Sequence, residues 1–355
     1  MSVDVPAPTR AESDSARATP PRDRPEATPP ESRGGGPTLI TVAFGPHHLE
    51  AIPAMVAAMR THQTILLEEP PFPGFSDLLA GRLAIDDYLL ETDPGFPRFA
   101  RALCHEMQEL FADGHRLLQV EPFLDGLAEI HERFADGATP AAILADEGLR
   151  DIYLAEKEAT GALIAFYAAS RGSDFRALTD AVLAFARLDA ARIRLRDRLR
   201  ARAILDLAAT GSRLYVEAGF IHFDLFRCLW AAATPGLRVE PLFLLQPEVA
   251  RRGLHRRNIG PGDVLTLYFI VHDRLDNPLA ELLAARSLIA VQLVAREELA
   301  PEAAAPFPHC ADDGLVNQLV DRLDLDQCRR LHARIRGLDR SAALRLAAQL
   351  AAGGT

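Results

Sequence analysis

The sequence predicts an α/β fold, with a central, mostly parallel sheet and flanking helices. A compact apolar run at residues 38–44, rich in β-branched residues and bounded by Pro37 and Gly45, is typical of a buried strand. A helical stretch and a second strand-like run follow within about thirty residues, an order that favours parallel pairing with a right-handed crossover. The same strand, turn and helix layout recurs at residues 212–233.

The first half of the chain provides these elements in order. After the loop at residues 45–48, residues 49–60 predict a helix, in which Pro53 is tolerable only near the first turn. Residues 63–69 predict the second strand. From about residue 76 to residue 209 the apolar residues recur at spacings of three and four, which predicts a long helical insertion in the middle of the chain.

The second half of the chain is expected to return to the sheet. Residues 212–218 predict a strand, which a turn at residues 219–222 joins to a short helix. Two later apolar runs, at residues 264–271 and 288–295, have the length and composition of further strands of the same sheet. They flank a predicted helix at residues 277–286.

The predicted domain organisation has three parts. Residues 1–36 contain no leucine, isoleucine or aromatic residue, cannot bury enough surface to offset their ordering entropy, and predict a disordered tail. The α/β domain is expected at residues 37–300. Residues 301–355 predict a C-terminal helical extension, in which residues 314–352 form a pair of amphipathic helices that serve packing or homo-oligomerisation.

Composition narrows the classes of partner and compartment. With 355 residues, of which 48% are hydrophobic and 25% charged, the chain resembles an ordinary globular protein. Its formal net charge of -10 argues against a nucleic-acid partner. Four scattered cysteines, no secretory signal and no apolar stretch long enough to span a membrane favour a soluble, cytoplasmic protein. The absence of GxSxG, P-loop and GxGxxG motifs argues against serine hydrolases, P-loop NTPases and standard dinucleotide-binding proteins.

The pattern Gly-x-x-His occurs directly after two of the predicted strands, at Gly45–His48 and Gly219–His222. Glycine lets the backbone turn sharply at the strand end, and the histidine then sits at the start of the following helix, facing the cleft. The predicted second strand ends in Glu68 and Glu69. If the strands pair in parallel, two imidazoles and at least one carboxylate can meet at one edge of the sheet, as a metal-binding or general-base set.

Simpler interpretations stay open for these residues. Successive strand residues point to opposite faces, so at most one of Glu68 and Glu69 reaches the cleft directly, and the sequence does not choose between them. The motif histidines could instead satisfy backbone groups at helix starts, and the neighbouring His47 is interpreted as a bystander. Glu217 and Asp224, which flank the second motif, either orient its histidine or are surface carboxylates.

This combination of motifs resembles the Tiki/TraB superfamily, which also takes in the erythromycin esterase-like and ChaN-like proteins. The resemblance spans about residues 38 to 230. The arginine-rich stretch at residues 196–204 also resembles the helix that precedes the second motif in these proteins, with Arg196 as the counterpart of a recurrent arginine. The residues that carry the resemblance are Gly45, His48, Glu68, Glu69, Arg196, Gly219 and His222.

The resemblance implies an erythromycin esterase/ChaN-like fold with the motif residues around one cleft. Some members are manganese- or cobalt-type metalloproteases, so we expect a metal-dependent hydrolase of peptide or ester bonds. A mixed histidine and carboxylate set suits manganese, cobalt or zinc, and the ion would lower the pKa of a bound water while a glutamate takes the proton. The expected roles are a metal set of His48, His222 and Glu68, catalytic Glu68, Glu69 and Arg196, and structural turns at Gly45 and Gly219.

Two other functions remain open. As in the erythromycin esterase branch, a histidine could activate water without a metal while glutamates orient it. The chain could instead be a non-enzymatic ligand-binding or regulatory protein of the TraB/ChaN type, whose cleft holds a peptide, haem or another ligand. For either enzyme the expected substrate is a peptide or a small-molecule ester.

Overall fold

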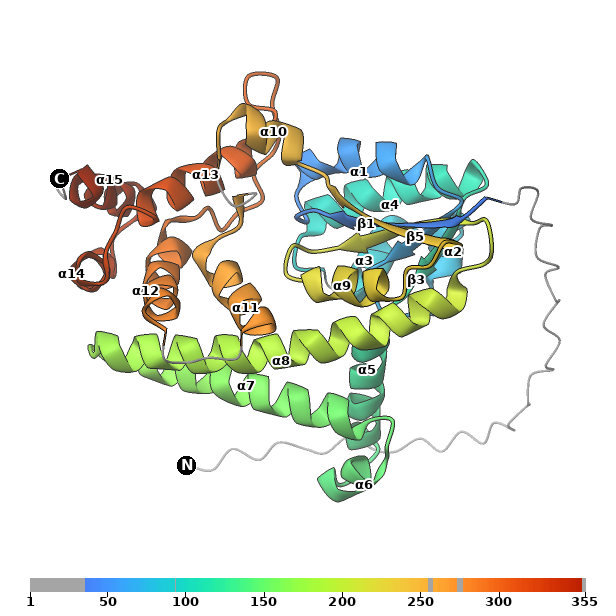
Figure 1. Cartoon of the computed structure of the whole chain (residues 1–355), viewed down its shortest axis with the longest axis horizontal. Coiled ribbons are helices and arrows are strands. Elements are labelled where there is room, and N and C mark those ends of the chain that lie inside the picture. Colours follow the sequence, from blue (N-terminus) through green and yellow to red (C-terminus); the bar gives the residue numbers. More distant parts are fainter. Residues whose placement is uncertain (1–35, 93, 255–257, 273–276, 353–355) are drawn as a thin grey trace, which may run out of the picture. The chain divides into compact units, whose positions relative to one another are not determined.

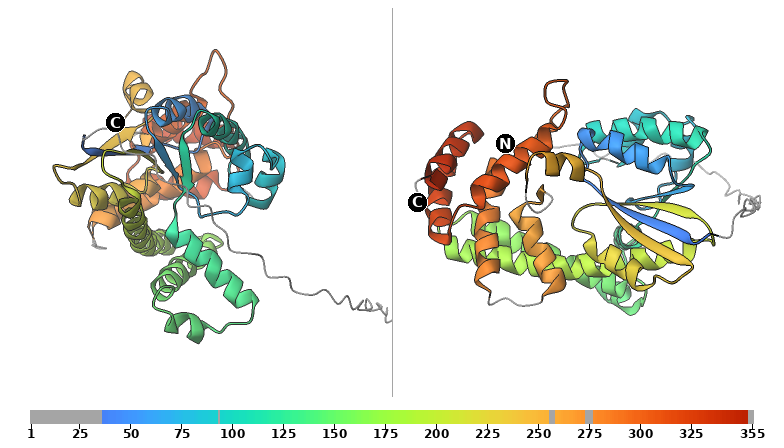
Figure 2. Two further views of the ribbon diagram at one scale, coloured as in Figure 1. Left: turned by 90° about the vertical axis from the view of Figure 1, so that its right-hand side faces the viewer. Right: turned by 45° about the horizontal axis from the view of Figure 1, so that its top comes forward.

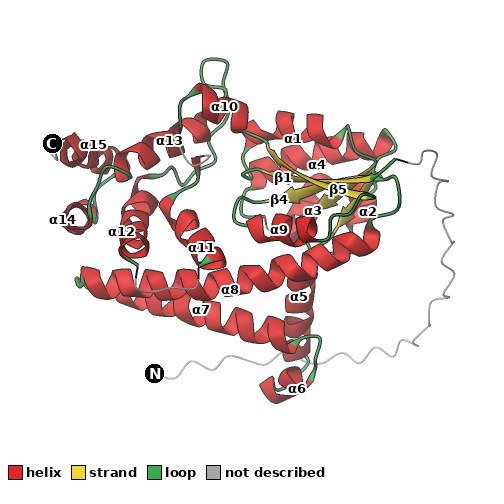
Figure 3. Cartoon of the chain, in the orientation of Figure 1, coloured by secondary structure: helices red, strands yellow, loops and turns green. Residues whose placement is uncertain are grey.

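The computed structural model describes residues 36–92, 94–254, 258–272 and 277–352. The protein contains a five-stranded sheet with helices on both faces, which confirms the predicted α/β fold (Figures 1 and 3). The chain from Gly34 to Thr355 forms one compact unit. The disordered tail predicted at residues 1–36 lies outside the described residues, except for its last glycine.

The sheet consists of β1 (Thr38–Phe44), β2 (Thr64–Leu67), β3 (Arg116–Gln119), β4 (Arg213–Ala218) and β5 (Leu237–Phe243). The strand order is β3-β2-β4-β1-β5, and all neighbouring strands pair in parallel. The first strand-helix-strand unit is therefore parallel as predicted, but β4 lies between its two strands. This order brings the carboxyl end of β2 next to that of β4, and hence Glu68 next to the second Gly-x-x-His segment.

Two helical layers cover the sheet: α1 (Ile52–Met59) and α4 (Pro97–Ala112) on one face, and α8 (Phe175–Leu207) and α9 (Phe223–Ala231) on the other (Figure 2). Alternate residues of β1 pack against the two helical layers. Ala43 packs in the cluster that contains α1 and α4, whereas Val42 packs in the cluster that contains α8 and α9. Strands that are buried on both faces are apolar along their whole length, which made β1 easy to predict.

The helical insertion in the middle of the chain is present, although the short strand β3 interrupts it. Its last helix, α8, is 33 residues long and is capped by Asp174, whose side chain accepts hydrogen bonds from the N–H groups of Arg176 and Ala177. The remaining helices of the insertion are α2 (Phe75–Leu79), α3 (Ile85–Thr92), α5 (Pro122–Ala135), α6 (Pro140–Ala145) and α7 (Arg150–Ser170).

The two late strands predicted at residues 264–271 and 288–295 are wrong, because both runs are helical. They belong to α11 (Pro261–Val271) and α12 (Pro278–Leu293), and the second run continues the helix predicted at residues 277–286. The buried residues of α12 lie on every side of the helix. A helix that is buried all round lacks the amphipathic period, so its short apolar runs resemble buried strands.

The C-terminal part contains α10 (Gln246–Arg251), α13 (Pro308–Val320), α14 (Leu325–Ile335) and α15 (Arg340–Ala352). Residues 314–352, which were predicted to form a pair of helices, instead belong to the three helices α13, α14 and α15. These three share a hydrophobic core with α12, so helices on both sides of the boundary predicted at residue 300 pack together. The boundary and the oligomerisation role stay predictions. Within the described ranges, no helix combines the length and the apolar character needed to cross a membrane.

Candidate functional site

Both Gly-x-x-His segments lie at the carboxyl ends of neighbouring parallel strands, β1 and β4. His48 directly precedes the short helix η1 (Leu49–Ala51), and His222 directly precedes α9. Each histidine therefore stands where its strand ends and a helix starts, as the pattern predicts. The carboxyl edge of an open parallel sheet is also where α/β proteins bind ligands.

The two motif glycines meet different requirements. A Cβ on Gly45 would lie 2.6 Å from Leu244 Cδ1, so a side chain there requires the end of the Leu244 side chain to shift. Gly219 has room for a Cβ, and its N–H donates a hydrogen bond to Glu68 Oε2 at 2.8 Å. Neither glycine is among the described residues with positive φ, so the expected special turn conformation is not the reason for either.

His222 is held between two carboxylates. Its Nε2 lies 2.9 Å from Glu68 Oε1, and its Nδ1 lies 2.5 Å from Asp197 Oδ1. The residue is 3% exposed. Burial alone would lower the pKa of His222, but the charge of Glu68 and the hydrogen bonds with both carboxylates outweigh burial and raise the pKa to about 9. His222 is therefore an imidazolium at neutral pH, with both N–H groups donated.

Glu68 and Glu69 turn to different partners. Besides His222, Glu68 Oε1 accepts a hydrogen bond from Arg196 Nη2 at 3.0 Å. Burial would raise the pKa of Glu68, but His222 and the nearby arginines hold it well below its usual range. Glu69 instead accepts from Gln119 Nε2 at 2.8 Å, and burial raises its pKa. The residue that joins the second motif is thus Glu68, a choice that the sequence left open.

Two arginines on successive turns of α8 complete the ion network beneath this edge. Arg196 Nε lies 3.0 Å from Glu121 Oε2, so Arg196 bridges Glu68 and Glu121. Arg200 is fully buried and donates from Nε to the carbonyl oxygen of Val120 at 2.8 Å. Its Nη1 lies 3.8 Å from Glu68 Oε2. The network ties β2, α5 and α8 to the second Gly-x-x-His segment.

The sequence prediction missed three of these residues, Asp197, Arg200 and Glu121. A signal for two of them exists in α8, where charged residues at positions 197 and 200 interrupt the buried stripe formed by Ile193, Ala201 and Ile204. A charged side chain on the apolar face of a helix needs a buried partner. Glu121 carries no such signal, because it lies in the loop between β3 and α5.

His47, interpreted above as a bystander, belongs to the same edge. Its Nε2 lies 3.5 Å from Glu217 Oε1, and the other oxygen of Glu217 accepts from the Glu68 N–H at 3.1 Å. Its ring stacks on Phe99 with centroids 5.1 Å apart, and its side chain is 39% exposed. Burial would lower the pKa of His47, but the nearby Glu217 carboxylate raises it overall.

His48 lies in a different environment from His222. Its ring stacks on that of His309, with centroids 3.9 Å apart and an interplanar angle of 18°. Burial, together with the neighbouring His309 and His47, lowers the pKa of His48 to about 3. His309 Nε2 accepts a hydrogen bond from the Leu299 N–H at 2.8 Å, so this ring is also neutral in the structure. The structure brings His222, Glu68 and Arg196 together and leaves His48 outside that cluster.

An archaeal protein of Archaeoglobus fulgidus, described as uncharacterized, is 30% identical to the chain over 296 residues, which are 83% of this chain and 98% of the archaeal one. The chain belongs to the family of this archaeal protein. No protein-family model matches the chain, and no solved structure matches it. Because the archaeal protein is described as uncharacterized, the family relationship assigns no activity to this chain.

In the arrangement that the structure shows, the expected metal ligands His48, His222 and Glu68 do not form a metal site. Both ring nitrogens of His222 donate to carboxylates, and an imidazolium has no lone pair for an ion. The oxygens of Glu68 accept from His222, Arg196 and Gly219. Among the residues that the structure describes, no group of three or more His, Cys, Asp or Glu side chains could hold an ion. A metal at His48, His222 and Glu68 stays a prediction that requires these side chains to rearrange.

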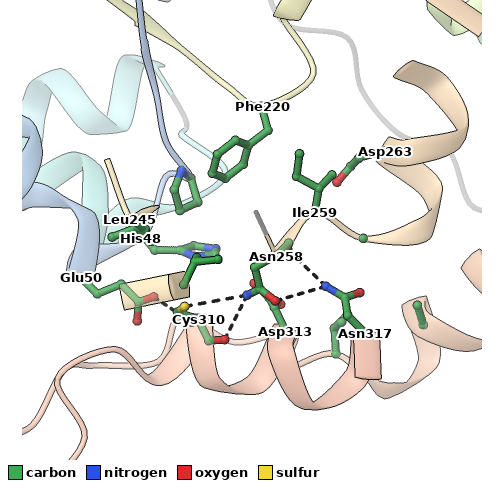
Figure 4. A pocket seen from close by; sticks show the side chains of 15 residues that line it. His48, Glu50, Phe220, Leu245, Asn258, Ile259, Asp263, Cys310, Asp313 and Asn317 are labelled. Atoms are coloured by element: carbon green, nitrogen blue, oxygen red, sulfur yellow. Dashed lines mark hydrogen bonds between the residues drawn. The ribbon is translucent and has the colours of Figure 1, made fainter. Parts of the chain in front are cut away.

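Two adjoining cavities lie beside this edge. One of about 250 Å³ is lined by His48, by Pro46 of the first motif and by Phe220 of the second (Figure 4). The other, of about 400 Å³, is lined by Ile221 and by apolar side chains of α7, α8, α11 and α12. The side chains of the second motif therefore lie in three different environments. His222 joins the ion network, Phe220 lines the first cavity and Ile221 lines the second.

Proposed function

We propose that the protein is a hydrolase of ester or peptide bonds in which His47 activates water with the support of Glu217. The observation that carries this proposal is the half-exposed His47 imidazole whose Nε2 faces a buried carboxylate. An imidazole oriented by a carboxylate is the arrangement that general-base catalysis uses. With Nε2 facing the Glu217 carboxylate at 3.5 Å, the other ring nitrogen, Nδ1, is left to accept a proton from water.

The electrostatics of this edge support the assignment. The raised pKa of His47 makes its imidazole a stronger base than an ordinary histidine. The two adjacent glutamates have pKa values pushed in opposite directions, down for Glu68 and up for Glu69. Carboxyl groups separated in this way serve different roles in acid-base sites. Glu68 acts as a fixed anion, and Glu69 acts as the acid.

The proposed step conserves its protons. His47 Nδ1 takes a proton from water while the water oxygen bonds to the substrate carbonyl carbon. Collapse of the tetrahedral intermediate breaks the bond to the leaving group, which takes a proton from Glu69. The proton on His47 then returns to the Glu69 carboxylate through solvent. Because the Glu68 N–H donates to Glu217, the ion network around His222 also positions the base.

The relationship to the Tiki/TraB superfamily is also a proposal. It is supported by the contacts that Glu68 makes with both Arg196 and His222, since all three residues belong to the motifs that carry the resemblance. The proposed chemistry corresponds to the metal-free branch of that resemblance. The proposed chemistry differs from that branch in one respect: the general base is His47, the residue before the motif histidine His48.

Hydrolysis of p-nitrophenyl esters and of a mixed fluorogenic peptide library, with and without EDTA, tests the proposal. His47→Gln and Glu217→Gln should each lower kcat/KM by about 100-fold or more, the usual contribution of a general base. The matched control is His105→Gln, which changes an exposed histidine of α4. Activity that survives His47→Gln, or no hydrolysis of any substrate, would overturn the proposal. Loss of activity in EDTA, in His48→Ala and in His222→Ala would instead support the metal-dependent enzyme.

A further inference from the structure

The two cavities beside the sheet edge differ in polarity. The smaller is lined by the carboxyl groups of Glu50, Asp263 and Asp313 and by the amides of Asn258 and Asn317 (Figure 4). The larger is lined mainly by apolar side chains, including two aromatic rings from α7 and α8, and its one carboxylate besides the shared Asp263, that of Asp189, is paired with Arg192. No lysine or arginine of the described chain lines either cavity. Of the two adjoining cavities, the smaller is therefore the acidic end and the larger the apolar end.

The carboxyl groups that line the smaller cavity differ in whether they have partners within the protein. Glu50 accepts hydrogen bonds from the N–H groups of His309 and Cys310, at 2.9 and 2.8 Å, and so caps the start of α13. Asp263 and Asp313 have neither a hydrogen bond nor an ion pair in the part of the chain that the structure describes. Burial and the nearby charges of Asp312, Glu50 and Asp263 raise the pKa of Asp313 to about 7. A positive charge in this cavity would remove that repulsion.

Asp263 lies at the junction of the two cavities. It lines both of them, together with Gly260, Ala290 and Val294. In the smaller cavity, Asn317 Nδ2 donates to Asn258, which leaves Asn317 Oδ1 free to accept. Two carboxylates and an amide oxygen match the three N–H donors of a primary ammonium group. Because both cavities share these lining residues, the rest of a ligand held here would extend into the apolar cavity.

We propose that the adjoining cavities bind an amphiphilic primary amine. Its ammonium group lies between Asp263 and Asp313, and its alkyl or aromatic part fills the larger cavity. This proposal does not depend on hydrolysis at His47, because binding can be measured in a protein without activity. Conversely, a folded protein that hydrolyses esters or peptides but does not bind octylamine would overturn the amine site and leave the proposed hydrolase intact.

Calorimetric titration with octylamine, octanol and octanoate tests the charge requirement. The titration is made near pH 8, where the Asp313 carboxyl is ionised. Octylamine should bind at least tenfold more tightly than the other two probes. Asp263→Asn and Asp313→Asn should each weaken octylamine binding at least tenfold, because each keeps the shape of the side chain and removes its charge. The matched control, Asp326→Asn on the surface of α14, should leave the affinity unchanged.

A series of linear amines tests the apolar end. Affinity should rise by about fourfold for each added methylene group that enters the larger cavity. Equal binding of octanol or octanoate, binding that survives both Asp263→Asn and Asp313→Asn, or an affinity independent of chain length would each overturn the proposal. Absence of octylamine binding to the folded protein would overturn it as well.

Discussion

The two Gly-x-x-His segments occupy equivalent positions on neighbouring strands, yet their histidines have opposite chemistry. His222 lies between Glu68 and Asp197, and these carboxylates raise its pKa to about 9. His48 is buried against His309, and its pKa falls to about 3. The strand end determines where each imidazole sits, whereas the side chains brought in by α8 and α13 determine whether it carries a proton.

The largest expected effect concerns the charged member of this pair. Asp197→Ala removes the carboxylate that holds His222 Nδ1 and that also accepts the Leu225 N–H. Removing one partner of a buried ion pair leaves an uncompensated charge, so we expect a loss of about 3 to 5 kcal/mol in the free energy of unfolding. Urea denaturation measures it, with Asp326→Ala on the exposed face of α14 as the control. A loss below about 1 kcal/mol would show that Asp197 does not hold a charged His222.

The two histidines should also limit stability at opposite ends of the pH range. A histidine whose pKa rises on folding stabilises fully below its ordinary value of 6.5, and His222 loses this contribution, about 3 kcal/mol, as the pH rises through about 9. His48 behaves in the opposite way. Because folding lowers its pKa to about 3, its contribution is present above 6.5 and is lost as the pH falls toward 3.

Thermal unfolding followed by circular dichroism from about pH 4 to about pH 10 separates these contributions. His222→Gln should flatten the decline of Tm at alkaline pH, and His48→Asn should flatten the decline at acid pH. If both variants flattened the same limb, the two histidines would not differ in charge as the structure indicates.

A smaller effect distinguishes the two glutamates. Glu68→Gln removes the charge nearest to His222 Nε2, so the pKa of His222 should fall by at least about one unit. Glu69→Gln is the matched control, since Glu69 contacts Gln119 and is not among the main causes of the raised pKa of His222. NMR titration of the His222 ring follows both variants. Equal shifts in the two variants would mean that the assignment of Glu68 to the second motif is wrong.

The sequence predicted the parts of this edge that depend on local patterns. The apolar run of β1 and the helix starts after His48 and His222 follow from periodicity and from the order of elements. The chemistry of the two imidazoles could not be predicted, because it depends on Asp197 and His309, which are distant along the chain and near only after α8 and α13 have packed. Likewise, the second part of α12 lies in a helix that is buried all round, so the apolar run at residues 288–295 resembles a strand although the helix at residues 277–286 was predicted.

The smallest expected effect compares the two motif glycines. Gly45→Ala places a Cβ within 2.6 Å of Leu244 Cδ1, and we expect a loss of roughly 1 kcal/mol in the free energy of unfolding because the end of a leucine side chain can shift. Gly219→Ala meets only ordinary contacts, at 3.7 Å from His222 and 3.9 Å from Glu68, so its effect should be near zero. Urea denaturation of both variants makes the comparison. A larger loss for Gly219→Ala would mean that the second motif needs its glycine for the path of the backbone, and that the two segments differ in conformation as well as in charge.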